Sequence, residues 1–189
     1  SPALLNLIFG SQITFYAFLF APIVLVMIIS SKINSLSASM ASFLFFVYSA
    51  VTGVTLSAIF LMYTQESIAT TFGITAGTFG ATALFGYVTK KDLSKMGSIL
   101  FMLLIGLIIA SVVNMFLKND TMMWILTYVG IVIFVGLTAY DMQKLKKIAH
   151  SIDDDESSIA KFAVLGALTL YLDFINLFLR LLQIFGKKR

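Results

Sequence analysis

Apolar residues in this sequence gather into long runs that short polar stretches separate, and they do not alternate with polar residues. A helix rises about 1.5 Å per residue, so each run is long enough to cross a hydrocarbon core of about 30 Å. The predicted spans cover residues 13–30, 38–63, 68–88, 98–117, 121–140 and 160–185. The pattern predicts an all-α, polytopic transmembrane helix bundle with six spans, and residues 1–189 form a single transmembrane domain.

Composition and the placement of charge support a membrane protein. The chain is 59% hydrophobic and only 12% charged. Residues 34–88 contain one charged side chain, Glu66, and then four charged residues follow at Lys90, Lys91, Asp92 and Lys95. The net charge of +4 comes from basic residues at span ends, which form no face with interleaved aromatic residues. We therefore expect the lipid bilayer as a partner and exclude nucleic acid.

Cysteine and histidine usage excludes several kinds of site. The sequence has no cysteine and one histidine. Disulfides, thiolate metal sites and histidine-cluster metal sites are therefore ruled out. We expect no resident cofactor.

The distribution of lysine predicts the orientation of the spans. By the charge rule for membrane proteins, loops rich in lysine and arginine lie on the cytoplasmic side. The polar stretches after the first, third and fifth spans carry most of the lysines, so we expect these stretches in the cytoplasm. The tail, Lys187, Lys188 and Arg189, falls on the opposite side and conflicts with this rule. Either the tail is an exception, or the last segment enters the membrane without fully crossing it.

Two carboxylates belong to predicted spans. Asp173 lies near the middle of the last apolar run, and Asp141 closes the run before it. An ionisable group inside a span costs about 2.5–3.5 kcal/mol on insertion scales, so such a residue marks a functional site by default. A single buried acid could instead stay protonated and merely hydrogen-bond a neighbouring helix. Two acids on consecutive helices favour the functional interpretation.

If the two carboxyl groups meet, they share a proton and titrate as a unit near physiological pH. Gain or loss of that one charge can switch helix packing, and the ionised form attracts cations. Tight calcium binding requires six to eight oxygen ligands, which this pair cannot supply. Asp141 and Asp173 are therefore predicted as a pH-sensing pair that makes weak, transient calcium contact.

Other residues of the spans have structural interpretations. Ala69, Gly73, Gly77 and Ala81 recur every four residues, which predicts a face for close helix packing. Arg180 follows Asp173 by about two helical turns, which separates them by about 10 Å along the axis. We expect Arg180 to extend toward the nearer membrane interface and not to pair with Asp173.

Four segments carry a family resemblance. They are VTGVTLSAIF at 51–60, TKKDL at 89–93, VGLTAYDMQK at 135–144 and GALTLYLDFINLF at 166–178. In order and over essentially the whole chain, they resemble the Bax inhibitor family, the transmembrane Bax inhibitor motif proteins, and particularly its bacterial inner-membrane branch.

The resemblance implies a seven-helix bundle with a central last helix, of which this chain would lack the first helix. It also implies a pH-sensitive calcium leak controlled by paired aspartates on the last two helices, which correspond to Asp141 and Asp173. Some relatives carry an arginine near the end of the helix that matches the first span, where it pairs with the penultimate helix. This chain has Ser31-Lys32-Ile33 there, so Lys32 is the possible gating partner.

Two other functions fit parts of this sequence, an intramembrane aspartyl protease and a non-conducting membrane regulator. An intramembrane aspartyl protease also uses two aspartates on neighbouring helices, but it is expected to present one of them in a Gly-x-Gly-Asp context. Asp173 follows Leu170-Tyr171-Leu172, so we expect no enzyme. The remaining alternative is a non-conducting regulator that binds other membrane proteins, such as a membrane protease, and for which Asp141 and Asp173 are dispensable.

Overall fold

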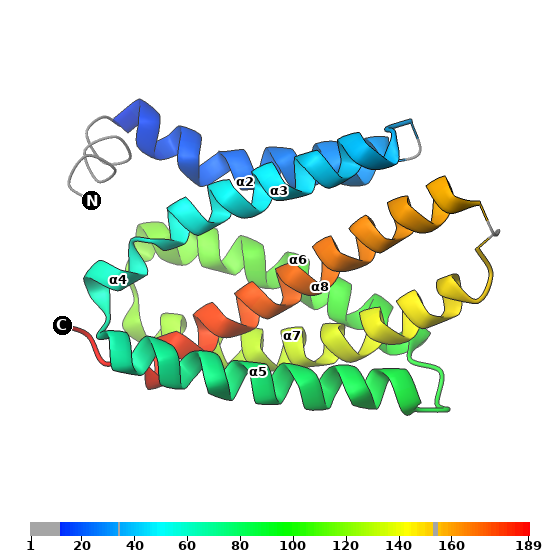
Figure 1. Ribbon diagram of the computed structural model, residues 1–189. Helices are drawn as coiled ribbons and strands as arrows, with labels where there is room; N and C mark the ends of the chain where they lie inside the picture. Colours follow the sequence, from blue (N-terminus) through cyan, green and yellow to red (C-terminus); the bar gives the residue numbers. More distant parts are fainter. Residues whose placement is uncertain (1–11, 34, 153–154) are drawn as a thin grey trace. The chain divides into compact units, whose positions relative to one another are not determined.

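The computed structural model describes residues 12–33, 35–152 and 155–189, with side chains omitted for residues 12–20 and 23, and it confirms the predicted all-helical fold (Figure 1). The helices of the described residues are α2 (Gln12–Lys32), α3 (Ala38–Leu56), α4 (Ile59–Met62), α5 (Gln65–Val88), α6 (Ser94–Leu117), α7 (Asp120–Ala149) and α8 (Glu156–Phe185). Five segments are long and apolar enough to cross a membrane: 38–62, α5, α6, α7 and α8. The first predicted span coincides with α2, a helix of 21 residues that contains Pro22.

The second predicted span is not one continuous helix. α3 ends at Leu56, and α4 begins at Ile59 after a turn. At this turn the Ser57 hydroxyl donates to the carbonyl of Val54 over 2.6 Å, and the Thr55 hydroxyl donates to Val51 over 3.0 Å. Hydroxyl side chains that bond to carbonyls in the preceding turn compete with the helical backbone and bend or end the helix.

α7 continues well beyond the predicted end of its span at residue 140. The predicted spans end at residue 140 and resume at residue 160, but α7 runs on to Ala149. Lys146 and Lys147 lie in its last turn, where their positive charges stabilise the negative end of the helix dipole. Asp141 consequently lies inside the helix, about two turns before its end, where its backbone position is fixed.

The chain divides into two compact units. The first comprises Ser1–Met62 and Ile152–Leu168, and the second comprises Tyr63–Ser151 and Thr169–Arg189. In the first unit α2 packs along α3, with Ile29, Ala41 and Tyr48 among its buried residues. The boundary between the units falls within α8, and the prediction of a single domain stays a prediction.

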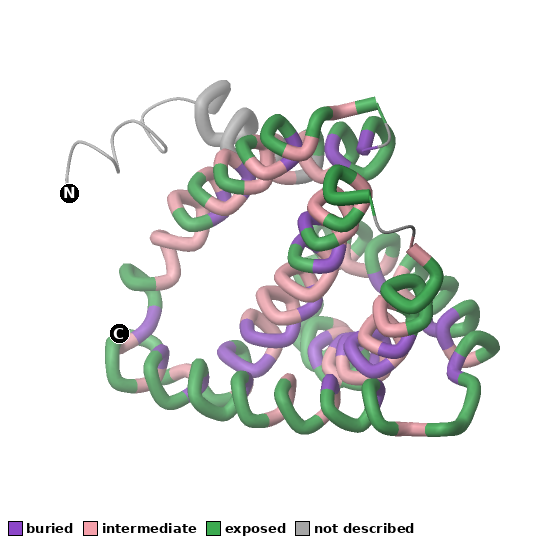
Figure 2. Tube along the Cα trace, turned by 45° about the vertical axis from the view of Figure 1, so that its right-hand side comes forward, coloured by how far each residue is buried: buried purple, intermediate pink, exposed green. Residues whose placement is uncertain are grey.

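In the second unit, α5 and α6 both pack on α7. The buried core of this unit comprises Leu100, Leu107, Ile133, Phe134, Leu137, Leu177 and Leu181 (purple in Figure 2). The Phe174 ring of α8 makes edge-to-face contacts with Phe72 and Phe79 of α5, each at 5.4 Å between ring centroids. These contacts hold the second half of α8 against the same three-helix layer.

Close helix approach occurs at other glycines than the predicted stripe. Within the second unit, a side chain at Gly73 or Gly77 would meet nothing within 4 Å. A Cβ at Gly86 would instead overlap the backbone of Ala139, and one at Gly97 would overlap the Tyr140 ring. Gly86 therefore allows α5 to touch α7 directly, while the predicted stripe lies exposed along α5.

The basic tail lies beside the start of α5. The Thr64 amide donates to the Lys187 carbonyl over 2.9 Å, and Tyr63 forms a backbone bridge with Lys188. α5 then runs about 36 Å before it reaches the lysine-rich loop at residues 89–93. The tail and this loop are therefore at opposite ends of the unit, so only one of them can follow the charge rule.

Candidate functional site

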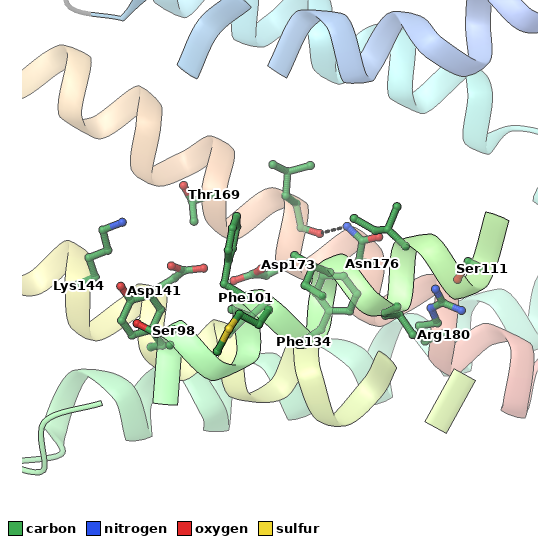
Figure 3. Close-up of a pocket in the computed structure, with 18 of the residues that line it drawn as sticks. Ser98, Phe101, Ser111, Phe134, Asp141, Lys144, Thr169, Asp173, Asn176 and Arg180 are labelled. Atoms are coloured by element: carbon green, nitrogen blue, oxygen red, sulfur yellow. Dashed lines mark hydrogen bonds between the residues drawn. The ribbon is translucent and has the colours of Figure 1, made fainter. Parts of the chain in front are cut away.

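Asp141 of α7 and Asp173 of α8 meet within the second unit, where their carboxyl groups lie close enough to interact electrostatically (Figure 3). Asp173 is only 5% exposed, and Asp141 is half-buried. The meeting of the two carboxylates that the sequence analysis depended on is therefore present in the structure. Their roles as pH-sensing and ion-binding residues stay predictions.

Two carboxyl groups that lie this close can share a hydrogen bond only when one of them carries a proton. An ionised carboxylate has no hydrogen to donate and can only accept. The second carboxyl oxygen of Asp173, Oδ2, is buried and has no hydrogen-bond partner among the described residues. Leaving such an oxygen unsatisfied costs about 1–3 kcal/mol.

The pair lines a cavity of about 870 Å³ between α6, α7 and α8. Its wall is mostly apolar and includes Phe101, Leu104, Leu107, Ile108, Phe134 and Leu137. Its polar members are Ser98, Ser111, Tyr140, Asp141, Lys144, Thr169, Asp173, Asn176 and Arg180. The α8 members recur every three or four residues, so they occupy one face of that helix.

The polar side chains divide between the two ends of the cavity (Figure 3). Asp141, Lys144 and Ser98 lie at one end, and Arg180 and Ser111 lie at the other. Lys144 is exposed and attracts Asp141 electrostatically. Among the described residues that line the cavity, the charged groups besides the pair are Lys144 on α7 and Arg180 on α8. The polar groups that α6 adds to this lining are the hydroxyls of Ser98 and Ser111.

The site offers little to a tightly bound metal. Within the described ranges, no group of three or more histidine, cysteine, aspartate or glutamate side chains gathers in one place. Two carboxylates and neighbouring carbonyls fall short of the six to eight oxygens that calcium takes.

Lys32, the predicted gating partner, is the last residue of α2 and is exposed. It belongs to the first compact unit, whereas Asp141 belongs to the second. A latch between Lys32 and Asp141 stays a prediction.

Sequence reasoning missed two features of the site. Ser111 and Arg180 line the same cavity as the aspartates, although Arg180 was expected to point away toward the interface. The buried side chain of Gln143, two residues after Asp141, donates to the Lys91 carbonyl over 2.8 Å and accepts from the Leu93 amide over 2.9 Å. The sequence offered one signal for this contact, which is the amide side chain of Gln143 two residues after Asp141. This clamp ties the 89–93 loop to the part of α7 that positions Asp141.

A family model and the sequences of known proteins both match this chain. The family described as inhibitor of apoptosis-promoting Bax1 matches residues 3–189. The inner membrane protein YbhL of Escherichia coli K12 is 53% identical over 190 residues, which cover 100% of this chain and 81% of that protein. An uncharacterised protein of Borreliella burgdorferi is 49% identical over 183 residues, covering 97% of this chain and 79% of that protein. The chain therefore belongs to the Bax inhibitor family and is an integral inner-membrane protein.

Proposed function

We propose that this protein is a pH-sensitive cation leak, with calcium as the permeant ion, controlled by the Asp141–Asp173 pair. The observation that carries the proposal is the close approach of the two carboxyl groups at the wall of the cavity, with the buried Oδ2 of Asp173 left without a partner among the described residues. A membrane protein that keeps two acids in contact inside its spans bears a substantial insertion cost for them. A role in moving charge explains that cost.

The proton is the switch in this proposal. With one proton between them, Asp141 and Asp173 hold α7 and α8 together by a hydrogen bond and carry a single negative charge. Loss of that proton leaves two like charges in contact, which repel each other and push the helices apart. The same change strengthens the attraction of the cavity for cations. Flux is therefore expected to rise with pH as the pair loses its shared proton.

The cation interacts weakly in this scheme. It contacts the two carboxylates and exchanges them for water, since conduction requires binding that is favourable enough to enter and weak enough to leave. No bond in a substrate is made or broken, so the proposal assigns transport and no enzymatic step to the pair.

The competing function is a non-conducting regulator that binds other membrane proteins. The exposed glycines of α5, Gly73 and Gly77, favour it because small residues allow close helix contact in a bilayer. On this alternative, neutral replacements of the aspartates leave function intact.

Calcium flux from proteoliposomes at several pH values separates the two functions. The protein, Asp141→Asn and Asp173→Asn are compared with Asp120→Asn, which neutralises an exposed acid at the start of the same helix α7. We expect both variants of the pair to lose the pH dependence, while Asp120→Asn keeps it. Unchanged, pH-dependent flux in both pair variants would remove the proposal, and absence of flux from the unmodified protein would favour the regulator.

A further inference from the structure

A cationic side chain that has no counterion among the described residues lies at the end of the cavity away from the aspartates. Arg180 is half-buried on α8, and its stem packs on Gly130 of α7, where an added Cβ would lie 3.0 Å from Nε of the guanidinium. Within the part of the chain that the structure describes, the guanidinium has neither an acid nor a hydrogen-bond partner. A partly buried cation of this kind is costly unless an anion pairs with it.

A second polar group shares this end of the cavity. The Ser111 hydroxyl oxygen on α6 is buried and has no hydrogen-bond partner among the described residues. Ser111 and Arg180 both line the cavity, and Figure 3 shows them together at its far end. A guanidinium and a hydroxyl are the donors that recognise a carboxylate, because the planar guanidinium can donate two parallel hydrogen bonds.

The rest of the cavity fits a long apolar chain. Its α6 wall runs from Gly97 to Val112, which corresponds to about 22 Å along the helix axis. Between these ends the lining is dominated by large apolar side chains such as Phe101, Leu104 and Ile108. Asp141 and Asp173 repel an anionic group, so only the Arg180 end of the cavity accepts the negative charge of a ligand.

We infer that the cavity binds a long-chain fatty-acid anion. Its carboxylate pairs with the Arg180 guanidinium and the Ser111 hydroxyl, and its single alkyl chain lies along α6 toward Asp173. A single chain suits a cavity of about 870 Å³ that is lined by three helices. Binding there places hydrocarbon beside the aspartate pair and excludes water from it. The inference does not depend on cation flux, so it can fail or hold independently of the proposed leak.

Direct binding tests the site. The full chain is reconstituted in phosphatidylcholine nanodiscs, and a fluorescent long-chain fatty acid is displaced with oleate, with uncharged oleyl alcohol or with phosphatidylglycerol. Arg180→Gln is expected to weaken oleate binding about tenfold, which is the loss of one charge-assisted contact. Ser111→Ala weakens it less, and oleyl alcohol binds the unmodified protein as weakly as oleate binds Arg180→Gln.

Arg189→Gln is the matched control, because it removes the same charge from an exposed position of the tail. Arg180→Lys keeps the positive charge but loses the planar guanidinium, so it should bind oleate with intermediate affinity. This variant replaces Arg180→Gln in the test if Arg180→Gln does not fold. Equal oleate affinity in the unmodified protein and Arg180→Gln would overturn the inference. Tighter binding of phosphatidylglycerol than of oleate would overturn the choice of a single-chain ligand.

Discussion

At the scale of single residues, the environment of each acid determines what it can do. Asp173 is buried beside a second carboxyl group, whereas Asp92 lies in the exposed loop between α5 and α6 with a lysine against it. Asp92 Oδ1 accepts from the Lys147 ammonium over 2.7 Å and from the Ser94 hydroxyl over 2.8 Å. These contacts lower the pKa of Asp92 from 3.8 to about 2, and the Lys147 hydrogen bond is the largest cause.

Removing Lys147 should therefore return the Asp92 pKa toward its ordinary value. The folded pKa lies below the unfolded one, so this contact stabilises the fold above about pH 4 and is lost as the pH falls toward 2. Carboxyl-carbon NMR titration of Asp92 in Lys147→Gln measures the change. Lys146→Gln is the control, because the Lys146 ammonium donates to the Tyr87 carbonyl instead. An unchanged Asp92 pKa in Lys147→Gln would contradict the assignment.

At the scale of helices, backbone contact between α5 and α7 positions the site. Gly86 lies against the backbone of Ala139, two residues before Asp141. The Gln143 clamp then fixes the loop that follows α5 to the same part of α7. Asp141 is thus held between two points of attachment, so its carboxyl group keeps its position relative to α8.

Enlarging Gly86 should separate these helices. Gly86→Ala places a methyl group where the Ala139 backbone lies, and we expect a loss of about 1–3 kcal/mol in the free energy of unfolding. Gly80→Ala on the same helix adds the same methyl group in open space and should be nearly neutral. Unfolding in mixed detergent micelles compares the two variants. Equal stability of both would show that α5 and α7 are not in contact at Gly86.

Helix positions and the acid pair were largely predictable from the sequence, and helix contacts were not. Apolar runs define spans because the bilayer requires them, and a carboxylate inside a run is informative because it is costly there. The packing role of Gly73 and Gly77 was wrong within the second unit, since spacing alone does not tell which face of α5 meets α7. The cavity around Arg180 was not predictable for the same reason, because Gly130 and Ser111, which lie far from Arg180 in the sequence, contribute to its surroundings.

At the scale of the whole molecule, lysine distribution and the fold agree on orientation except at the tail. The Lys-rich loop at 89–93 and the carboxyl-terminal part of α7 lie at one end of the second unit, tied by Gln143. The tail and the start of α5 lie at the other end, tied by the Thr64–Lys187 hydrogen bond. The charge rule then places the first end in the cytoplasm.

The absence of cysteine from the sequence allows this orientation to be measured directly. In intact cells, Lys91→Cys should resist a membrane-impermeant thiol reagent, while Lys118→Cys in the loop between α6 and α7 should react. Both should react after the membrane is permeabilised. The opposite pattern of labelling would reverse the orientation and show that the tail, not the loops, follows the charge rule.

The most direct test of the central claim is infrared spectroscopy of the carboxyl groups, because Asp141 and Asp173 are proposed to share one proton. The account predicts a protonated-carboxyl carbonyl band that persists above the pH at which exposed aspartates ionise and disappears as the pair loses its proton. This band should be altered in Asp173→Asn and unaffected in Asp120→Asn. A spectrum with no such band once the exposed acids have ionised would contradict the account, because two ionised carboxylates cannot share the proton that is proposed to join α7 to α8.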